Sequence, residues 1–152
     1  ILRQPLGVTA LMLAVNNGNL DMIRYLIKKG ADINIKDKKG QTALMYAAKR
    51  RIYANSPGMK KVLVWNNKIP ETEIIQYLLN KGAKINDSDI NGDTPLIIAS
   101  GVGSTQTVEI LLKHGSDINA KNNKKETALL KALLMNDYDI AKILKDSVEN
   151  KK

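Results

Sequence analysis

The phrase GDTPLIIA, Gly92–Ala99, decides the fold because it occurs four times along the chain with small changes. The other versions are GVTALMLA (Gly7–Ala14), GQTALMYA (Gly40–Ala47) and KETALLKA (Lys125–Ala132). Each version places a Thr before an apolar segment, and a Thr hydroxyl can accept a hydrogen bond from the first backbone N–H groups of a helix. Pro95 stands at the first helical position, where a missing N–H costs nothing. The phrase therefore predicts the start of a helix at four places.

A second phrase follows the first three copies and has the features of a helix end. Its versions are YLIKKGADIN (Tyr25–Asn34), YLLNKGAKIN (Tyr77–Asn86) and ILLKHGSDIN (Ile110–Asn119). The Gly in each version suits the left-handed residue that closes a helix. The segments DKKG (Asp37–Gly40) and DING (Asp89–Gly92) then have the composition of tight turns. Each unit thus reads as turn, helix, tight link, helix, and neighbouring units must stack because none can bury its apolar face alone.

The repeat period is 33 residues, both from Thr9 to Thr42 and from Thr94 to Thr127. From Thr42 to Thr94 the spacing is 52 residues, which is 19 more, so the second unit carries an insertion. This pattern resembles the ankyrin repeat. The period, the Thr-Pro-Leu-like start and the Leu-Leu-x-x-Gly-Ala-Asp-x-Asn-like end of that family are all present, and they cover the chain except for the insertion.

The resemblance implies an all-α solenoid of about four helix-turn-helix repeats, joined by β-turn or hairpin tips, in a single domain over residues 1–152. We expect repeats at about 4–36, 37–88, 89–121 and 122–152, with an insert at about 51–69 and a C-terminal cap as the last repeat. Polar residues on the final helical segment favour such a cap. Further repeats are expected before Ile1, because the chain begins inside a repeat without a Met.

Two departures from the family pattern have structural consequences. The usual His after Thr-Pro-Leu is replaced by Met12, Met45, Ile97 and Leu130, so its hydrogen bonds between neighbouring repeats should be missing. Lys125 stands where the turn Gly of the last repeat belongs. A side chain at that position would have to adopt the conformation that Gly adopts most readily.

Composition argues against catalysis and against a metal site. The chain has no Cys and one His, which excludes disulfides, thiolate zinc sites and thiol nucleophiles. We interpret His114, just before a helix-closing Gly, as structural, because a polar or cationic side chain suits a helix C-terminus. The segment NDSDINGD (Asn86–Asp93) alternates oxygen ligands but lacks the bidentate Glu of a calcium loop, so we interpret it as a turn. No catalytic residue, metal or cofactor is predicted.

The charge balance points to the class of partner. The net charge is +9, which favours acidic proteins, nucleic acids or anionic membranes. A Lys-rich solvated surface without a charged partner is the alternative. No apolar run is long enough to cross a membrane. We expect a monomer, and a cytoplasmic location by default, while secretion or a periplasmic location stays open because the chain begins inside a repeat.

In ankyrin-like arrays, partners usually bind the turn tips and the inner face of the first helices. Carried over by position, the resemblance implies a basic partner-binding surface, with exposed apolar anchors at Tyr46, Ile90 and Ile98. Its members are Lys36, Lys38, Lys39, Gln41, Tyr46, Lys49, Arg50, Ser88, Ile90, Asn91, Asp93, Ile98, Lys121, Asn123, Lys124 and Glu126. Apolar anchors beside charges are typical of protein interfaces.

The insert forms a second candidate surface. Six of its flanking and internal residues are basic and none of residues 49–69 is acidic. Its candidate contact residues are Arg51, Tyr53, Lys60, Lys61, Trp65 and Lys68. We expect the preceding helix to run to about Tyr53, and Trp65 to pack against a neighbouring helix surface so that the insert forms a flap.

The leading hypothesis is a non-catalytic protein–protein interaction module with an acidic protein partner. The alternative is binding to nucleic acid or an anionic membrane surface through the basic insert, where Tyr53 and Trp65 could stack on bases. The excess of Lys over Arg weighs against it. A third hypothesis is that the array targets a larger enzyme.

Overall fold

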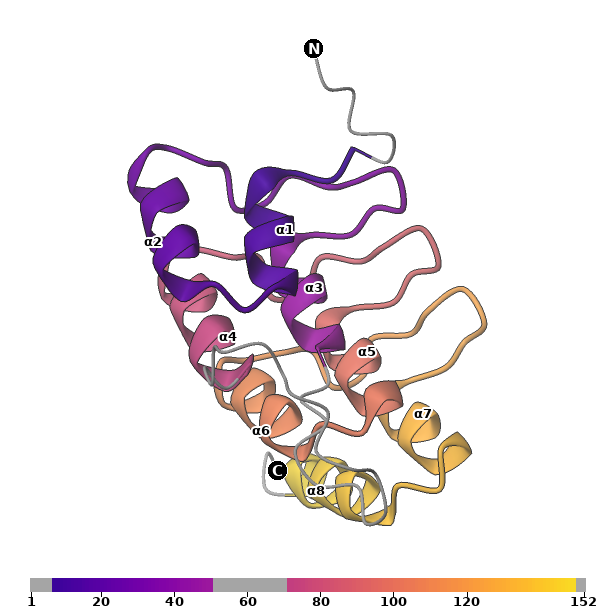
Figure 1. Ribbon diagram of the computed structural model, residues 1–152. Helices are drawn as coiled ribbons and strands as arrows, with labels where there is room; N and C mark the ends of the chain where they lie inside the picture. The colour runs from indigo at the N-terminus through magenta and orange to yellow at the C-terminus, as the bar shows by residue number, and fades with distance from the viewer. Residues whose placement is uncertain (1–6, 51–70, 150–152) are drawn as a thin grey trace, which may run out of the picture.

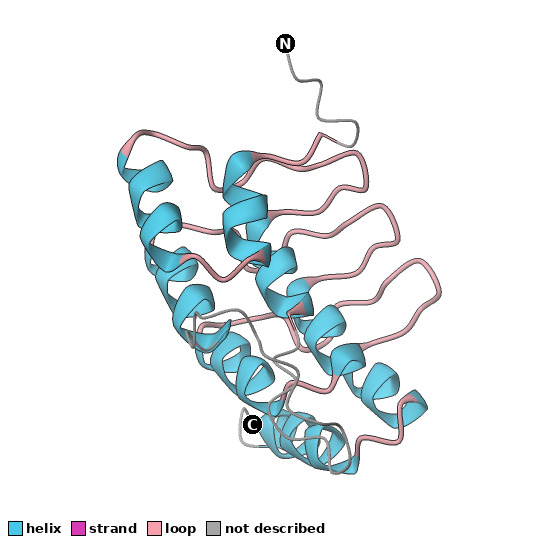
Figure 2. Cartoon of the chain, viewed as in Figure 1, coloured by secondary structure: helices cyan, strands magenta, loops and turns pink. Residues whose placement is uncertain are grey.

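The computed structural model describes residues 7–50 and 71–149. All regular secondary structure in those two ranges is helical, which confirms the predicted all-α fold class (Figure 2). The helices are α1 (Ala10–Asn16), α2 (Leu20–Lys28), α3 (Ala43–Lys49), α4 (Glu71–Asn80), α5 (Pro95–Val102), α6 (Thr105–Lys113), α7 (Ala128–Leu134) and α8 (Tyr138–Glu149). None of these helices is long and apolar enough to span a bilayer.

The helices form two parallel rows (Figure 1). One row contains α1, α3, α5 and α7, the other contains α2, α4, α6 and α8, and the tips project beyond the first row. Each helix of the first row packs on its partner in the second row, and α1, α3 and α5 also pack on the next helix of their own row. The solenoid predicted from the repeated phrases is therefore confirmed.

Helices of the first row begin at the predicted Thr residues. The hydroxyl oxygens of Thr9, Thr42, Thr94 and Thr127 accept hydrogen bonds from backbone N–H groups three residues later, at 3.2 to 3.4 Å. Thr42 and Thr94 are buried, so these bonds also satisfy hydroxyl groups that water does not reach. The glycines that follow α2, α4 and α6 have positive φ, as predicted for helix-closing residues.

The core lies between the two rows and consists of Leu, Ile, Val, Ala and Met. Its largest fully buried side chains are Leu11, Met12, Ile23, Leu44, Met45, Ile74, Ile75, Leu78, Leu96, Ile97, Leu111 and Ile140. Met12, Met45 and Ile97 hold the position of the family's His and are buried. Apolar packing thus occupies the place where the family's histidine would form hydrogen bonds.

Hydrogen bonds between repeats are found at other positions. The N–H of Ile90 donates to the carbonyl of Lys39 at 3.0 Å, which joins the first two described tips. The N–H of Asn123 donates to the carbonyl of Asn91 at 2.9 Å, which joins the next pair. On the other side of the stack, the Asn34 side chain accepts from the N–H of Lys84 at 2.9 Å. The tips therefore form a continuous, hydrogen-bonded edge.

The prediction that α3 extends to about Tyr53 is wrong, because the helix does not continue even to Arg50. The helix ends at Lys49, and Arg50 has an extended backbone with φ −64° and ψ 116°. The good helix propensity of the segment does not continue the helix past that point. The insert residues Arg51, Tyr53, Lys60, Lys61, Trp65 and Lys68, and the packing expected for Trp65, lie outside the described residues.

The last tip contains Lys125 in a left-handed conformation with φ 64°. We expect Lys125→Gly to raise the free energy of unfolding by about 0.5–1 kcal/mol, because Gly removes the steric penalty of that conformation but adds disorder to the unfolded chain. Urea unfolding followed by circular dichroism measures the change. Lys125→Ala is the control: it removes the charge and keeps the Cβ, so an equal gain in that variant would contradict the backbone explanation.

Candidate interaction surface

In each tip, an Asp or Asn side chain accepts hydrogen bonds from two backbone N–H groups of the turn. The Asp37 carboxylate Oδ1 accepts hydrogen bonds from the N–H groups of Lys39 and Gln41, both at 2.8 Å. The N–H of Gly40 donates to the Asp37 carbonyl at 2.9 Å and completes the turn. The Asp37 side chain is buried at the base of the tip, so its oxygen replaces water as the partner of two backbone donors.

The next two tips repeat this arrangement. Asp89 Oδ1 accepts from the N–H groups of Asn91 at 2.8 Å and Asp93 at 3.0 Å. Asn122 uses its amide oxygen in the same way, accepting from Lys124 and Glu126 at 3.0 and 2.9 Å. A side-chain oxygen therefore fixes the same backbone conformation in three tips, whether it belongs to a charged Asp or a neutral Asn.

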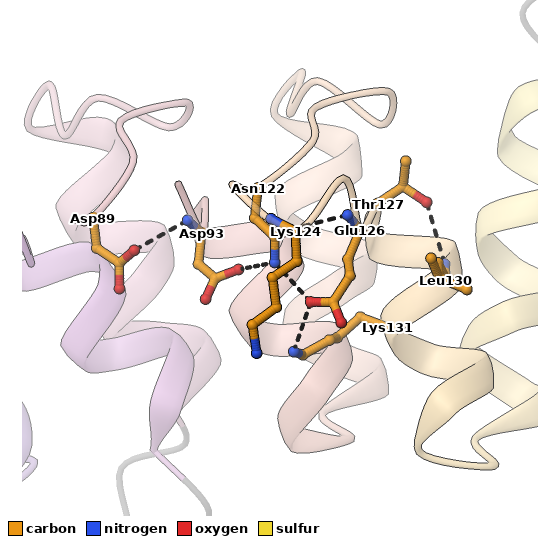
Figure 3. Close-up of polar contacts among 8 residues, drawn as sticks. All are labelled: Asp89, Asp93, Asn122, Lys124, Glu126, Thr127, Leu130 and Lys131. Atoms are coloured by element: carbon orange, nitrogen blue, oxygen red, sulfur yellow. Dashed lines mark hydrogen bonds and ion pairs between the residues drawn. The ribbon is translucent and has the colours of Figure 1, made fainter. Parts of the chain in front are cut away.

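Polar side chains also link the bases of neighbouring tips (Figure 3). The Asn122 amide donates to Asp93 Oδ1 and to Glu126 Oε2, both at 2.8 Å. Lys131 Nζ lies 3.1 Å from the same oxygen of Glu126. The hydrogen bonds from Asn122 and Lys131 lower the pKa of Glu126. The carboxylates of Asp93 and Glu126 are thus already engaged within the chain.

Tyr46 and Lys49 on α3 lie close to the Asp side chains at the bases of the tips. The Tyr46 hydroxyl donates to Asp37 Oδ2 at 3.0 Å. Burial is the larger cause of a raised pKa of Tyr46, and the contact with the Asp37 carboxylate raises it further. Lys49 Nζ lies 6.0 Å from the centre of the Tyr46 ring. Although Lys49 as a whole is exposed, burial around its ammonium group lowers its pKa, and Asp89 and Asp37 oppose that effect.

The outer ends of the tips combine an apolar residue with cations. Ile90 is 62% exposed on the middle tip, between the tip that carries Lys39 and the tip that carries Lys124. Both lysines are exposed. Lys36 is exposed too, but its Nζ donates to the Ser88 carbonyl at 2.8 Å and is held between tips. Asn91, Lys121 and Asn123 are also exposed at this edge.

Three of the predicted contact residues have less accessible side chains than expected. Gln41 and Ile98 are buried, so Ile98 is not the exposed anchor that its position suggested. The guanidinium of Arg50 lies against Gly18, so closely that a Cβ at Gly18 would overlap it. Burial lowers the pKa of Arg50, and Glu71 opposes that shift. Ile90 and Tyr46 remain as apolar candidates, Ile90 exposed and Tyr46 partly covered.

The sequence placed Asp37 and Asp89 in turns, where such carboxylates hydrogen-bond their own backbone, but it did not single out Asn122. Asp37, Asp89 and Asn122 each stand five residues before a helix-capping Thr, and that regular spacing was a usable signal. Lys131 has no such signal, because its contact with Glu126 depends on how α7 follows the tip. His114 Nδ1 lies 2.9 Å from the carbonyl of Ile110, which agrees with a structural role at the end of α6.

A family model described as "Ankyrin repeats (3 copies)" matches residues 2–69 and 61–152. This chain belongs to the ankyrin repeat family. It is 33% identical over 138 residues to a putative ankyrin repeat protein of Fowlpox virus, a match that covers 88% of this chain and 35% of that protein. It is also 33% identical over 135 residues to the B-cell lymphoma 3 protein homolog of Mus musculus, with 88% of this chain and 26% of that protein covered.

A third ankyrin repeat relative is neurogenic locus notch homolog protein 1 of Xenopus tropicalis, 29% identical over 145 residues. That match covers 95% of this chain and 5% of the relative. The chain thus spans 35% or less of the length of these three relatives. Ankyrin repeat arrays are generally non-catalytic protein–protein interaction modules, so the exposed tips of this array form a candidate protein-binding surface.

Proposed function

We propose that this ankyrin array is a non-catalytic module that binds an acidic protein partner through its tips and the inner face of its first helices. The observation that carries the proposal is the placement of exposed Ile90 between Lys39 and Lys124 on three hydrogen-bonded tips. An apolar anchor with flanking cations fits a partner segment that has an apolar side chain between carboxylates.

The rigidity of the tips supports this surface. Asp37, Asp89 and Asn122 each hold two backbone N–H groups, so the tip backbone is ordered before a partner arrives. A partner then loses less free energy to ordering the surface that it binds. Tyr46 and Lys49 extend the surface onto the inner face of α3.

A peptide selection tests the proposal by showing which ligand composition the array prefers. Random peptides displayed on phage are selected on the array. We expect the recovered peptides to be rich in Asp and Glu around an apolar residue, because the exposed lysines attract carboxylates. Their binding should weaken at least tenfold in the double variant Lys39→Glu with Lys124→Glu, and should weaken with added salt. Fluorescence polarisation with labelled peptides measures both effects.

The matched control makes the same change of charge on the second helices. Lys28 and Lys113 are exposed at equivalent positions of α2 and α6, and Asn80 and Asp146 hold that position elsewhere, so it tolerates loss of the cation. Lys28→Glu with Lys113→Glu should leave peptide binding unchanged. Equal loss of peptide binding in both double variants would show that the net charge of the protein, and not the tip surface, determines binding. Salt-dependent binding to duplex DNA or anionic vesicles, with no acidic peptide recovered, would favour the nucleic-acid or membrane alternative.

A further inference from the structure

An Asn is followed directly by Gly at two places in the chain, at Asn17 and at Asn91. In such a pair the backbone nitrogen of Gly can attack the side-chain carbonyl carbon of Asn, because Gly has no Cβ to hinder the approach. The attack closes a five-membered imide ring and releases ammonia. Water then opens the ring to Asp or to its β-linked isomer, isoaspartate. Either product replaces a neutral amide by a carboxylate.

The two pairs lie in different surroundings. Gly18, which follows Asn17, is buried, and the guanidinium of Arg50 lies so close that a Cβ on Gly18 would overlap it. Gly92, which follows Asn91, is partly exposed at the middle tip. Asn91 is exposed, and its side chain makes no hydrogen bond with the residues that the structure describes. Ring closure at Asn17 must therefore displace Arg50, whereas ring closure at Asn91 needs only a change in the tip.

That change is an opening of the middle tip, because hydrogen bonds hold the reacting peptide group. The N–H of Gly92 donates to the Asp89 carbonyl at 2.9 Å, and the carbonyl of Asn91 accepts from the N–H of Asn123 at 2.9 Å. Asp89 Oδ1 also accepts from the N–H groups of Asn91 and Asp93. Asp89 thus accepts three hydrogen bonds of one exposed turn, and a local opening of that turn releases them together.

We infer that Asn91 is a site of spontaneous deamidation, controlled by the opening of the middle tip. The closed tip protects the amide, and the open tip lets the Gly92 nitrogen reach the side-chain carbonyl of Asn91. The whole conversion consumes one water and releases one ammonia, with no change of oxidation state. Exposed turns open far more often than the whole chain unfolds, so the folded array itself reacts.

The new carboxylate lies in a row of cations on the tips. Asn91 holds the position of Lys39 in the preceding tip, 52 residues earlier, and of Lys124 in the next tip, 33 residues later. It also adjoins Ile90, the exposed apolar residue of the middle tip. Deamidation therefore places a negative charge between two lysines and should weaken the binding of an acidic partner. This consequence rests on the proposed function, whereas the reaction does not.

The two products differ in their effect on the tips. Asp leaves the main chain unchanged, so the hydrogen bond from the Asn123 N–H to the carbonyl at position 91 persists. Isoaspartate lengthens the main chain by one methylene group beside Gly92, where an added Cβ would already lie 2.9 Å from the nitrogen of Asn123. The tips pack too closely for the longer chain. Isoaspartate should therefore separate the middle tip from the next one.

Incubation of the folded array at mildly alkaline pH tests the reaction. Peptide mapping by mass spectrometry follows Asn91 and Asn17 in the array, and a free peptide of residues 86–96 supplies the unprotected rate. Asn91 should convert about 5- to 30-fold more slowly than in the peptide, as expected for a modest cost of local opening. Asn17 should convert more slowly than Asn91. An Asn91 that converts no faster than Asn17 overturns the inference.

Two variants at Asp89 test the control by tip opening. Asp89→Ala removes the acceptor of two backbone N–H groups, so the rate at Asn91 should approach that of the free peptide while Asn17 keeps its rate. Asp89→Asn retains that acceptor and should change the rate at Asn91 much less. Acceleration at Asn91 and Asn17 alike would indicate general unfolding and contradict tip control, as would an unchanged rate at Asn91 in Asp89→Ala.

Asn91→Asp isolates the effect of the new charge on ligand binding. In fluorescence polarisation, it should weaken the binding of the selected acidic peptides about two- to fivefold, as expected for one exposed charge. Asn17→Asp makes the same change of charge away from the tips and should leave binding unchanged. If Asn91 deamidates as expected but Asn91→Asp binds the peptides as tightly as the unmodified chain, the reaction stands and the proposed role of the tips is contradicted.

Discussion

Replacing Gly92 by Ala is expected to lower the free energy of unfolding by about 2–3 kcal/mol, from two causes that act together. Gly92 has φ 77°, which penalises any residue with a Cβ. A Cβ there would also lie 2.9 Å from the backbone nitrogen of Asn123 and 3.1 Å from the Cα of Asn122. The tips of adjacent repeats pack too closely for a side chain, so the substitution must push them apart. Guanidinium unfolding followed by circular dichroism measures the loss.

Gly30→Ala separates the two causes. Gly30 has φ 89°, but a Cβ there would meet nothing within 4 Å. This variant therefore carries only the conformational penalty, and we expect it to lose about 1 kcal/mol. The difference between the two variants reports on the contact between tips. Equal losses would show that the neighbouring tip moves away without cost.

The second large effect is expected for Asp89→Ala, which should lower the free energy of unfolding by about 2–4 kcal/mol. The substitution removes the acceptor of the N–H groups of Asn91 and Asp93, and also the acceptor of the Gln41 amide at 3.4 Å. Asp89 is buried, so water replaces these hydrogen bonds poorly. Urea unfolding gives the change, and two-dimensional NMR should show the largest amide shifts at the middle tip.

Asp89→Asn is the matched control, because Asn122 already performs this role with an amide oxygen in the next tip. The variant keeps Oδ1 as the acceptor for both backbone N–H groups. It replaces Oδ2, the acceptor of the Gln41 amide at 3.4 Å, by an NH2 group, and it loses the interaction of the charge with Lys49. We expect a loss within about 1 kcal/mol. If Asn lost as much stability as Ala, the negative charge rather than the acceptor geometry would hold the tip.

The sequence by itself determined the local structure and its order along the chain. Capping by Thr94, closure by Gly82 and the turn at Gly92 each depend on a few neighbouring residues, so a short phrase is enough to predict them. Repetition of the phrases then gave the stacking, because units that cannot bury their apolar faces alone must cover one another. The basic tips and the exposure of Ile90 also followed from position within the repeat.

Only the tertiary structure decided which side chains the proposed partner-binding surface can offer. Leu13 and Ile98 hold equivalent positions, yet Leu13 is exposed and Ile98 is buried, because α5 has a neighbouring helix of its own row on each side whereas α1 has one in the described range. The hydrogen bonds of Asn122 with Asp93 and of Gln41 with Asp89 likewise join residues 29 and 48 positions apart. Burial and pairing depend on what the next repeat places against a residue, and a local pattern does not contain that information.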